Sequence, residues 1–361
     1  MDFDKSQIIA ALQKVADPLT GNDIISSRLV ENLQTEGQNI SFNLVLSPSH
    51  NAYKGTLNFS CIAAVNQLYP QAEVHIHVVS KAASAQRPAT RFQNVIAVAS
   101  GKGGVGKSTV AVNLALGLKS LGASVGLLDA DLYGPSLPTM FGLQNARPRI
   151  DESEGKPKIV PIEKFGIPTI SIGYIIDAEQ AVVLRGPRLG AILKQFFEDC
   201  SWPDLDYLVI DLPPGTGDIQ LSLIQTVAVT GVVMVTTPQE VALADAIKGM
   251  NMFLLPNVNV PILGVVENMA WFSPAELPNN KYYIFGQGGG KKLALLSNTM
   301  LLGQIPLVQS IREGGDNGLP AMLGENEATK AAFLQVAQNV ARQIAVRNEL
   351  IAPTQKVEVK S

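Results

Sequence analysis

The segment Gly101–Thr109 reads GKGGVGKST and constrains the fold more than any other feature of the chain. It satisfies the pattern G-x-x-x-x-G-K-[ST] and stands between the apolar run Val95–Ala99 and a helical stretch that begins near its last residue. Glycines in such a loop let successive backbone N–H groups turn toward phosphate oxygens, and the N-terminus of the following helix adds its dipole. The order of strand, loop and helix therefore predicts a nucleotide-binding P-loop.

Individual residues of this loop have expected tasks. Lys107 is expected to reach the β- and γ-phosphates, and Ser108 to offer its hydroxyl to Mg²⁺. Lys102 is not required by the pattern. It either supplies positive charge during phosphoryl transfer or is a solvated loop lysine, and spacing alone leaves both readings open. The residues expected to surround ATP are Gly101, Lys102, Gly103, Gly104, Val105, Gly106, Lys107, Ser108 and Thr109.

Aspartates close two of the apolar runs that follow the loop. Asp129 and Asp131 follow one run, and Asp211 closes the next strongly apolar one. Carboxylates at the carboxyl ends of parallel strands lie in the ligand crevice of such sheets. Asp211 is predicted to hold Mg²⁺, directly or through water, and Asp131 to orient the attacking water. A helix N-cap is the alternative for Asp131, and Asp129 serves either as an outer partner of the metal or as a cap.

The apolar runs themselves indicate the fold class. They are continuous rather than alternating, which is typical of strands buried on both faces, and helical stretches lie between them. This pattern predicts a doubly wound, mainly parallel α/β sheet. The five runs are Val95–Ala99, Val125–Leu128, Tyr207–Ile210, Gly231–Val235 and Ile262–Val266.

The first part of the chain has a different pattern. Gln7–Val15 and Lys54–Leu68 carry apolar side chains at helical spacing, whereas Ile40–Leu46 and Ala72–Val79 alternate as half-buried strands do. We therefore expect a small α+β domain over residues 1–82.

A linker and a tail complete the predicted organisation. Residues 83–93 are poor in large apolar side chains and are expected to be a linker, followed by the P-loop ATPase domain over residues 94–347. The polar residues 348–361 are expected to form a disordered tail.

Composition excludes several classes of function. The formal net charge is −3 and the Lys and Arg residues do not cluster, so no nucleic-acid partner is expected. No apolar run reaches the ~18–20 residues that span a bilayer, and the N-terminus lacks the basic and apolar regions of a signal peptide. We expect a cytoplasmic protein without a membrane partner. Its two cysteines, Cys61 and Cys200, are far apart in the sequence, so a disulfide framework is not expected.

Several motifs together resemble the Mrp (ApbC-type) iron–sulfur cluster carrier ATPases. GKGGVGKST is shared with the wider deviant Walker A class, which includes septum-site ATPases, partition ATPases and nitrogenase iron protein. The motifs that resemble Mrp in particular are DADLYGPSLPTMFG from Asp129, RGP at Arg185, DLPPGTGD from Asp211 and TTPQEVALADA from Thr236. The resemblance covers nearly the whole chain, and residues 1–80 are similar to the iron–sulfur-assembly domain often fused ahead of this ATPase.

This resemblance implies roles for particular residues. Lys102 would be the signature lysine that contacts nucleotide across a homodimer, while Asp131 and Asp211 would keep the water-orienting and Mg²⁺ roles. Asn268 matches the family's adenine-reading asparagine, the alternative being a turn residue at the end of a strand. The segments Gly303–Leu307 and Ile311–Glu313 resemble the family's segments near the base and the dimer seam.

The chain departs from the family at the cluster site. Members usually carry a C-x-x-C after the Asn-Met pair, because iron–sulfur clusters need soft thiolate ligands. Ser273 and Glu276 stand where those thiols are expected. Core packing is the favoured interpretation of Cys61 and Cys200. His75 and His77, two apart on a strand, share a face that either holds a metal or is simply polar.

These observations together predict a homodimeric carrier that binds and slowly hydrolyses Mg-ATP in iron–sulfur cluster assembly. Its partners would be apo iron–sulfur client or scaffold proteins, and a cluster is possible although its usual ligands are absent. An ATP-dependent dimer switch or adaptor without a cluster is the first alternative. A spatial-positioning ATPase of the septum or partition type is the second, and it needs a membrane-seeking tail or a DNA-binding surface.

Overall fold

The computed structural model describes residues 3–19, 21–27, 29–46, 50, 53–80, 91–131, 134–152, 155–175, 186–274, 276–277 and 280–351. The chain divides into two compact units, the first made of residues 1–89 together with 345–352 and the second built on residues 90–344. Most of the expected linker, the motif at Arg185 and most of the expected tail lie outside the described residues.

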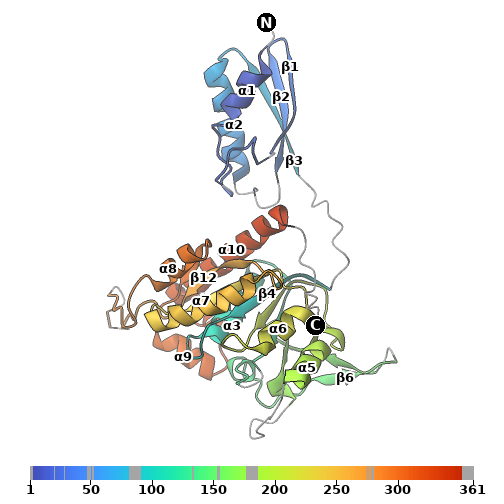
Figure 1. The fold of residues 1–361 in the computed structure, drawn as a ribbon, viewed down its shortest axis with the longest axis vertical. Coiled ribbons are helices and arrows are strands. Elements are labelled where there is room, and N and C mark those ends of the chain that lie inside the picture. The colour runs from blue at the N-terminus through green and yellow to red at the C-terminus, as the bar shows by residue number, and fades with distance from the viewer. Residues whose placement is uncertain are drawn as a thin grey trace. The chain divides into compact units, whose positions relative to one another are not determined.

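The first unit is a three-stranded sheet with two helices (Figure 1). Its sheet order is β1-β2-β3, with β1 and β2 antiparallel and β2 and β3 parallel. The helix α2 has the predicted bounds, whereas β1 was not predicted from the sequence. The elements are α1 (Lys5–Leu12), β1 (Val30–Glu36), β2 (Asn39–Leu46), α2 (Lys54–Leu68) and β3 (Glu73–Ser80).

Buried and partly exposed side chains alternate along much of β2, and this alternation forms the core of the first unit. Ile40, Phe42 and Leu44 are almost completely buried, and they pack in one cluster with Leu57 and Cys61 of α2. Side chains at alternate positions of a strand point to the same face, so one face of the sheet carries the core. The Cys61 side chain is a packing element of this cluster.

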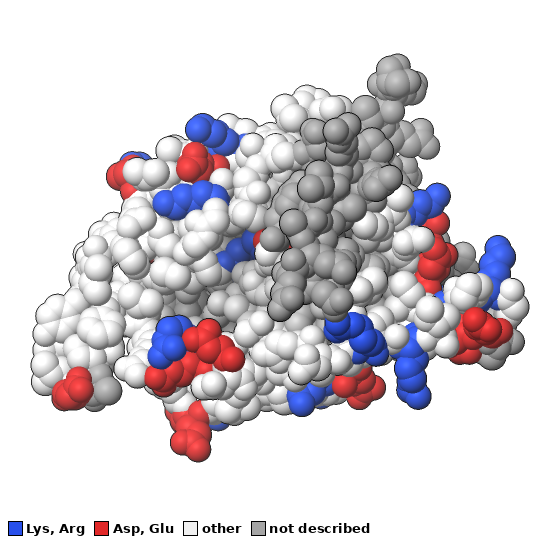
Figure 2. Space-filling model, turned by 90° about the horizontal axis from the view of Figure 1, so that it is seen from below, with Lys and Arg blue, Asp and Glu red and all other residues white. Residues whose placement is uncertain are grey.

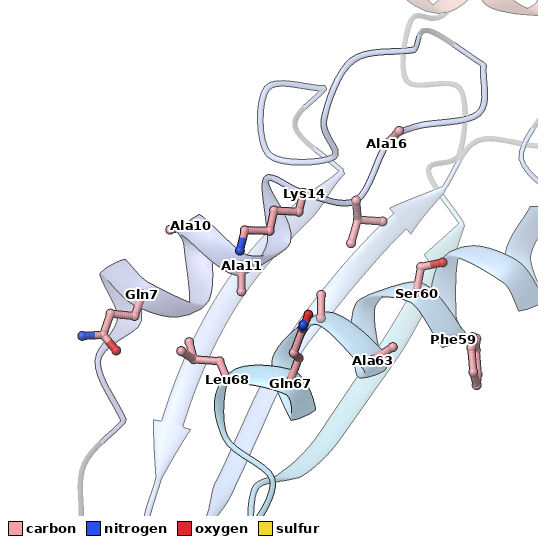
Figure 3. A pocket seen from close by; sticks show the side chains of 12 residues that line it. Gln7, Ala10, Ala11, Lys14, Ala16, Phe59, Ser60, Ala63, Gln67 and Leu68 are labelled. Carbon is pink, nitrogen blue, oxygen red and sulfur yellow. The ribbon is translucent and has the colours of Figure 1, made fainter.

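A shallow groove runs between α1 and α2 (Figure 3). Alanines from both helices line it, among them Ala10 and Ala63, and Gln7, Lys14 and Gln67 place polar ends along it. The small alanine side chains leave the trough unfilled between the helices. The exposed Phe59 lies at its margin with 73% of its surface accessible.

The second unit is built on an eight-stranded sheet with the order β13-β12-β11-β4-β10-β5-β9-β8. All neighbouring pairs are parallel except β8 and β9 at one edge. The predicted fold class is confirmed, although β8, β9 and β13 were not predicted. The strands are β4 (Phe92–Ala99), β5 (Val125–Asp129), β8 (Ile162–Lys164), β9 (Ile167–Ser171), β10 (Leu205–Asp211), β11 (Gly231–Thr236), β12 (Ile262–Glu267) and β13 (Leu301–Gln304).

Helices cover both faces of this sheet (Figure 1). Side chains of β4 alternate between two apolar clusters: Val95 and Ala97 pack with residues of α5 to α8, and Ile96 and Val98 pack with residues of α3 and α10. Burial on both faces accounts for the continuous apolar strands. The helices are α3 (Lys107–Ser120), α4 (Leu137–Met140), α5 (Gly186–Glu198), α6 (Asp218–Thr226), α7 (Glu240–Leu254), α8 (Gly289–Leu296), α9 (Gln309–Asp316) and α10 (Glu327–Leu350).

The strand order creates a crevice at the carboxyl end of β4. This strand lies between β10 and β11. From β4 the sheet continues through β10 and β5 on one side and through β11 and β12 on the other, so β4 is a topological switch point. Open α/β sheets bind ligands at the carboxyl ends of strands at such a point. A separate hairpin of β6 (Arg149–Asp151) and β7 (Lys158–Val160) lies outside this sheet. In the described part of the chain, no helix has both the length and the apolar character needed to cross a membrane.

Candidate nucleotide site

The P-loop joins β4 to α3, as the sequence predicts. Gly104 and Gly106 both have φ of 80°, the left-handed region that glycine enters without strain, and Gly106 is the N-cap of α3. Val105 between them is buried and anchors the loop. This geometry presents the first turn of α3 at the carboxyl edge of the sheet, where helix N-termini bind phosphate.

Gly101 has a different structural reason to be glycine. A Cβ built on it would lie 2.1 Å from the backbone carbon of Asp245 in α7, a separation that real Cβ atoms do not show. A Cβ built on Gly103 would meet nothing nearer than Pro214, at 4.0 Å. Gly101 thus lets α7 approach the start of the loop.

Lys107 sits at the centre of the polar cluster. Its side chain is 6% exposed, and its Nζ lies 2.5 Å from Oδ1 of Asp211 and 3.7 Å from Oδ2 of Asp131. The Nζ atom also donates to the hydroxyl of Ser108 at 3.3 Å. The cluster brings the adjacent Lys107 and Ser108 of the P-loop together with two carboxylates, Asp131 and Asp211, that lie far from them in the sequence.

Asp211 and Ser108 form a donor set suited to Mg²⁺. The Ser108 hydroxyl and the Asp211 carboxylate both lie beside Lys107, whose Nζ donates to each of them. Desolvation raises the pKa of Asp211, while the charge and hydrogen bond of Lys107 act in the opposite direction. Few carboxylates and hard oxygen donors are what Mg²⁺ prefers, so these two residues fit the ion.

Asp129 is a structural residue beside this cluster. It is completely buried, and its carboxylate accepts from the N–H groups of Asp131 and Leu137 and from the hydroxyl of Ser171. Leu137 is the first residue of α4, so Asp129 caps that helix. Desolvation, reinforced by the charge of Asp211, raises the pKa of Asp129 to about 7.

Asp131 does not cap α4, because the N–H of Leu137 at the start of that helix donates to Asp129 instead. One carboxylate oxygen of Asp131 accepts from the N–H of Gly134 at 3.3 Å, and the other faces Lys107. The side chain therefore has an oxygen at the phosphate-binding side of the cluster. This position is compatible with the water-orienting role, which remains a prediction.

Asn268 contacts the P-loop directly. It follows β12, and its Nδ2 donates to the carbonyl of Val105 at 2.8 Å. A Cβ built on Gly106 would lie 2.2 Å from the same nitrogen, so the two segments are in close contact. The next residue, Met269, has φ of 54°, which is unusual for a side chain of its size.

Glu267 is a buried residue to which sequence reasoning gave no role. It is fully buried at the end of β12, and its carboxylate accepts from the N–H of Gly290 in α8 and from Nε2 of Gln304 at 2.6 Å. A negative charge at a helix N-terminus is stabilised by the helix dipole. An acidic residue at the end of an apolar run was the available signal, and it is the same signal that identified Asp211.

Lys102 lies partly exposed at the outer side of the loop. Its backbone carbonyl accepts from the hydroxyl of Ser100 at 3.0 Å. Among the described residues, no ion pair or hydrogen bond engages its ammonium group. The side chain can therefore reach toward a ligand, and its role at the nucleotide stays a prediction.

The segment that replaces the family's C-x-x-C is held by protein contacts. Ser273 donates its hydroxyl to the carbonyl of Asn280 at 2.9 Å, and Nζ of Lys281 lies 4.0 Å above the ring of Trp271. Ser273 thus closes a turn. Its hydroxyl is committed to a backbone carbonyl.

Both cysteines are poorly placed to hold a cluster. Cys61 and Cys200 are each fully buried, in different units, and burial raises the pKa of Cys61 to about 11 and that of Cys200 to about 12. His75 and His77 are exposed on β3, with His75 4.0 Å from Glu73. Across the ranges that the structure describes, no three His, Cys, Asp or Glu residues are placed to share a metal.

One face of the molecule carries charges of both signs. On the face shown in Figure 2, basic and acidic side chains occur close to one another, and neither sign forms a continuous patch. This face offers no broad field of one sign to a polyanion.

Comparison with known proteins identifies the family. The family model described as the NUBPL iron-transfer P-loop NTPase matches residues 91–341, and the model of the iron–sulfur cluster assembly protein matches residues 5–78. The chain belongs to the Mrp-type iron–sulfur cluster carrier proteins. Within this family, a relative from Synechocystis is 41% identical over 94% of this chain and 97% of its own. A second relative, from Deinococcus radiodurans, is 43% identical over 96% of this chain and 98% of its own. Both are named iron–sulfur cluster carrier proteins.

Solved structures agree with the family assignment. A nucleotide-binding protein from Archaeoglobus fulgidus, in complex with ADP, is 35% identical, covers 63% of this chain and 87% of its own, and has a TM-score of 0.55. The septum site-determining protein MinD from Pyrococcus horikoshii, complexed with Mg-ADP, is 23% identical. The match covers 70% of this chain and 98% of the MinD chain, with a TM-score of 0.51. The second likeness shows the fold alone. This carrier-family chain is therefore a P-loop NTPase in its second unit.

Proposed function

We propose that this chain binds and hydrolyses Mg-ATP and, as a homodimer, carries iron–sulfur clusters to apoproteins in the cytoplasm. The observation that carries the ATPase proposal is the cluster of Lys107, Ser108, Asp131 and Asp211 around the first turn of α3. Family membership supports the carrier role, because the relatives named above are iron–sulfur cluster carriers.

The residues divide the work of phosphoryl transfer between them. Lys107 would leave Asp211 and neutralise the β- and γ-phosphates, while Asp131 would hold the attacking water in line with the bond to be broken. Asp211 and Ser108 would hold Mg²⁺, which supplies positive charge to the phosphate oxygens when bound. The partly exposed Lys102 would add charge from the partner subunit, which is why a homodimer is proposed.

Steady-state phosphate release with Mg-ATP tests the ATPase proposal. Lys107→Ala is expected to abolish turnover, but it also leaves Asp211 buried without its cation, which destabilises the fold. The double variant with Lys107→Ala and Asp211→Asn removes both charges and is expected to recover thermal stability without recovering turnover. Turnover in either variant would contradict the assignment of the P-loop lysine.

A specific observation favours a second candidate, an ATP-dependent dimer switch that carries no cluster. Ser273 and Glu276 offer hard oxygens where the family has thiols, and Cys61 and Cys200 are buried with raised pKa values. Hard oxygens suit Mg²⁺ or Ca²⁺ better than iron–sulfur units. The residues present do not fit the family's bridging cluster.

Anaerobic reconstitution with iron and sulfide separates the two candidates. Wild type and a Cys61→Ala, Cys200→Ala double variant would be compared by iron content and visible absorption. Cluster on wild type that disappears in the double variant supports carriage at a relocated thiol site. No cluster on either protein favours the switch, and cluster that survives in the variant contradicts the ligand argument.

A further inference from the structure

Gln220 in α6 fastens the loop that follows Asp211. Its side chain is 1% exposed, and its Nε2 donates to two carbonyl oxygens of that loop, Pro213 at 2.9 Å and Gly215 at 2.6 Å. A primary amide nitrogen carries two N–H groups, so one side chain serves both carbonyls. The loop is closed on itself by a residue that comes after it in the sequence.

The same loop is attached to the start of the P-loop. The N–H of Leu212 donates to the carbonyl of Val98 in β4, and the N–H of Gly215 donates to the carbonyl of Ser100, each at 3.0 Å. Gly215 has φ of 97°, a conformation that suits glycine. The loop therefore runs from the Mg²⁺-binding carboxylate along the first residues of the phosphate-binding loop.

The arrangement at Gln220 has an energetic cost that packing alone does not explain. Its Oε1 is buried and accepts no hydrogen bond within the described residues. A buried polar atom without a partner is unfavourable, and an apolar side chain of similar size would avoid that cost. What an apolar side chain would lose is the pair of bonds that fixes the carbonyls of Pro213 and Gly215.

We propose that Gln220 is a positioning residue for ATP hydrolysis, acting by holding the Pro213–Gly215 turn against the P-loop. With the turn fixed, its backbone and Asp211 keep one geometry beside the transferred phosphate, where misplacement by about 1 Å costs much of the rate. This inference rests on the proposed ATPase function. Both N–H groups of Gln220 are used inside the loop, so its amide nitrogen has no donor left for a phosphate, and the residue acts through the loop that it holds.

The test compares Gln220→Leu with a matched control, Asn94→Leu. Asn94 is also a buried amide of the second unit, and its Nδ2 donates to the carbonyl of Asp206 at 3.0 Å, near the amino end of the sheet rather than the P-loop edge. Three quantities are measured on the full-length proteins: kcat for Mg-ATP, Kd for Mg-ADP, and the ratio of the Kd values for a non-hydrolysable ATP analogue and ADP. Amide hydrogen exchange of Leu212 and of residues 215–217 is followed in parallel, since Pro213 and Pro214 carry no N–H.

We expect Gln220→Leu to lower kcat at least tenfold and to leave Kd for Mg-ADP within twofold. The exchange of the N–H groups of Leu212 and residues 215–217 should quicken at least about tenfold, and the analogue-to-ADP ratio should shift at least about fivefold. Asn94→Leu should keep kcat and the analogue-to-ADP ratio of Kd values within about twofold of wild type. This should hold even if its Tm falls as much as the Tm of Gln220→Leu.

Two results would overturn the inference. One is a kcat within twofold of wild type together with unchanged exchange of the loop in Gln220→Leu. The other is an equal loss of kcat in both variants, which would reduce Gln220 to a stability residue. If wild type itself does not hydrolyse ATP, the proposed function fails, and the exchange rates and the affinity ratio then decide the inference about the loop separately.

Discussion

The side-chain nitrogen of Asn268 lies 2.8 Å from the carbonyl oxygen of Val105, so a residue at the end of β12 holds the centre of the P-loop. The two residues are 163 positions apart in the sequence. Within the described residues, the Oδ1 atom of Asn268 accepts no hydrogen bond. One end of this amide is thus committed to the loop, and the other is available to read a base.

Asn268→Ala and Asn268→Asp should separate these two tasks. Alanine removes both ends of the amide, so we expect weaker ADP binding, by about tenfold for one buried hydrogen bond, and a reduced preference for ADP over GDP. Aspartate removes only the donor, so binding should weaken while the preference for adenine remains. Calorimetric titration with both nucleotides checks this. An unchanged preference in Asn268→Ala would show that the residue supports the loop without reading the base.

Asp131→Asn should separate catalysis from binding. The amide keeps the shape of the side chain but loses the charge that faces Lys107 at 3.7 Å and the capacity to accept a proton from water. We expect kcat for ATP to fall at least about a hundredfold, within the range of general-base removal, with Kd for Mg-ADP changed less than about threefold. A collapse of ADP affinity would instead make Asp131 a residue that holds the site together.

Much of the second unit was predictable because its signals are local. The strand, the glycine loop and the helix stand next to one another in the sequence, and the apolar runs that became β4, β5, β10, β11 and β12 are continuous because both faces are buried. The edge strands β8 and β13 are short and only partly buried, and β9 is interrupted by Pro168 and Thr169, so none of the three is a continuous apolar run.

The finer parts of the site depend on contacts that no local pattern contains. The hydrogen bond from Asn268 to Val105 exists only once β12 and the P-loop, which are distant in the sequence, lie side by side. The two hydrogen bonds from Gln220 span only seven and five residues, but they depend on the turn geometry of their loop, which the residue types alone did not indicate. The sequence suggested Asp129 as either metal partner or cap, and only the contact with the N–H of Leu137 favours the cap.

The two cysteines should be unreactive in the native protein. A pKa of about 11 for Cys61, against an ordinary value near 9, lowers the thiolate fraction at pH 8 about a hundredfold, and Cys200 is shifted further. Because the folded state favours the protonated thiols, the stability that they contribute is present below pH 9 and is lost as the pH rises through 11 and 12.

Titration with Ellman's reagent measures this. We expect no rapidly reacting thiol at pH 8, two after unfolding in guanidinium, and faster native reaction as the pH is raised. Rapid modification of either cysteine in the native protein at pH 8 would contradict the burial seen here and reopen that thiol as a cluster ligand.

Gly101 and Gly103 offer a test of which loop glycines the fold requires. A Cβ on Gly101 would collide with the backbone of Asp245, and Gly249, on the same face of α7, has the Cα of Gly101 within 3.8 Å of its own built Cβ. Backbone atoms cannot move aside as a flexible side chain can, so Gly101→Ala must displace α7, at a cost of about 1–3 kcal/mol for overpacking. Gly103→Ala meets only ordinary contact with Pro214, and its cost should stay within about 0.5 kcal/mol.

Both tryptophans of the chain, Trp202 and Trp271, lie in the second unit, so their fluorescence reports the unfolding of that unit. Urea titration without nucleotide should therefore show a lower midpoint for Gly101→Ala and a nearly unchanged one for Gly103→Ala. Equal midpoints would mean that α7 does not pack on Gly101 as closely as described. A much lower urea midpoint for Gly103→Ala would mean that other atoms occupy the space beside Gly103 in solution. The expected difference would show that the first glycine of the motif is needed by the fold before any nucleotide is bound.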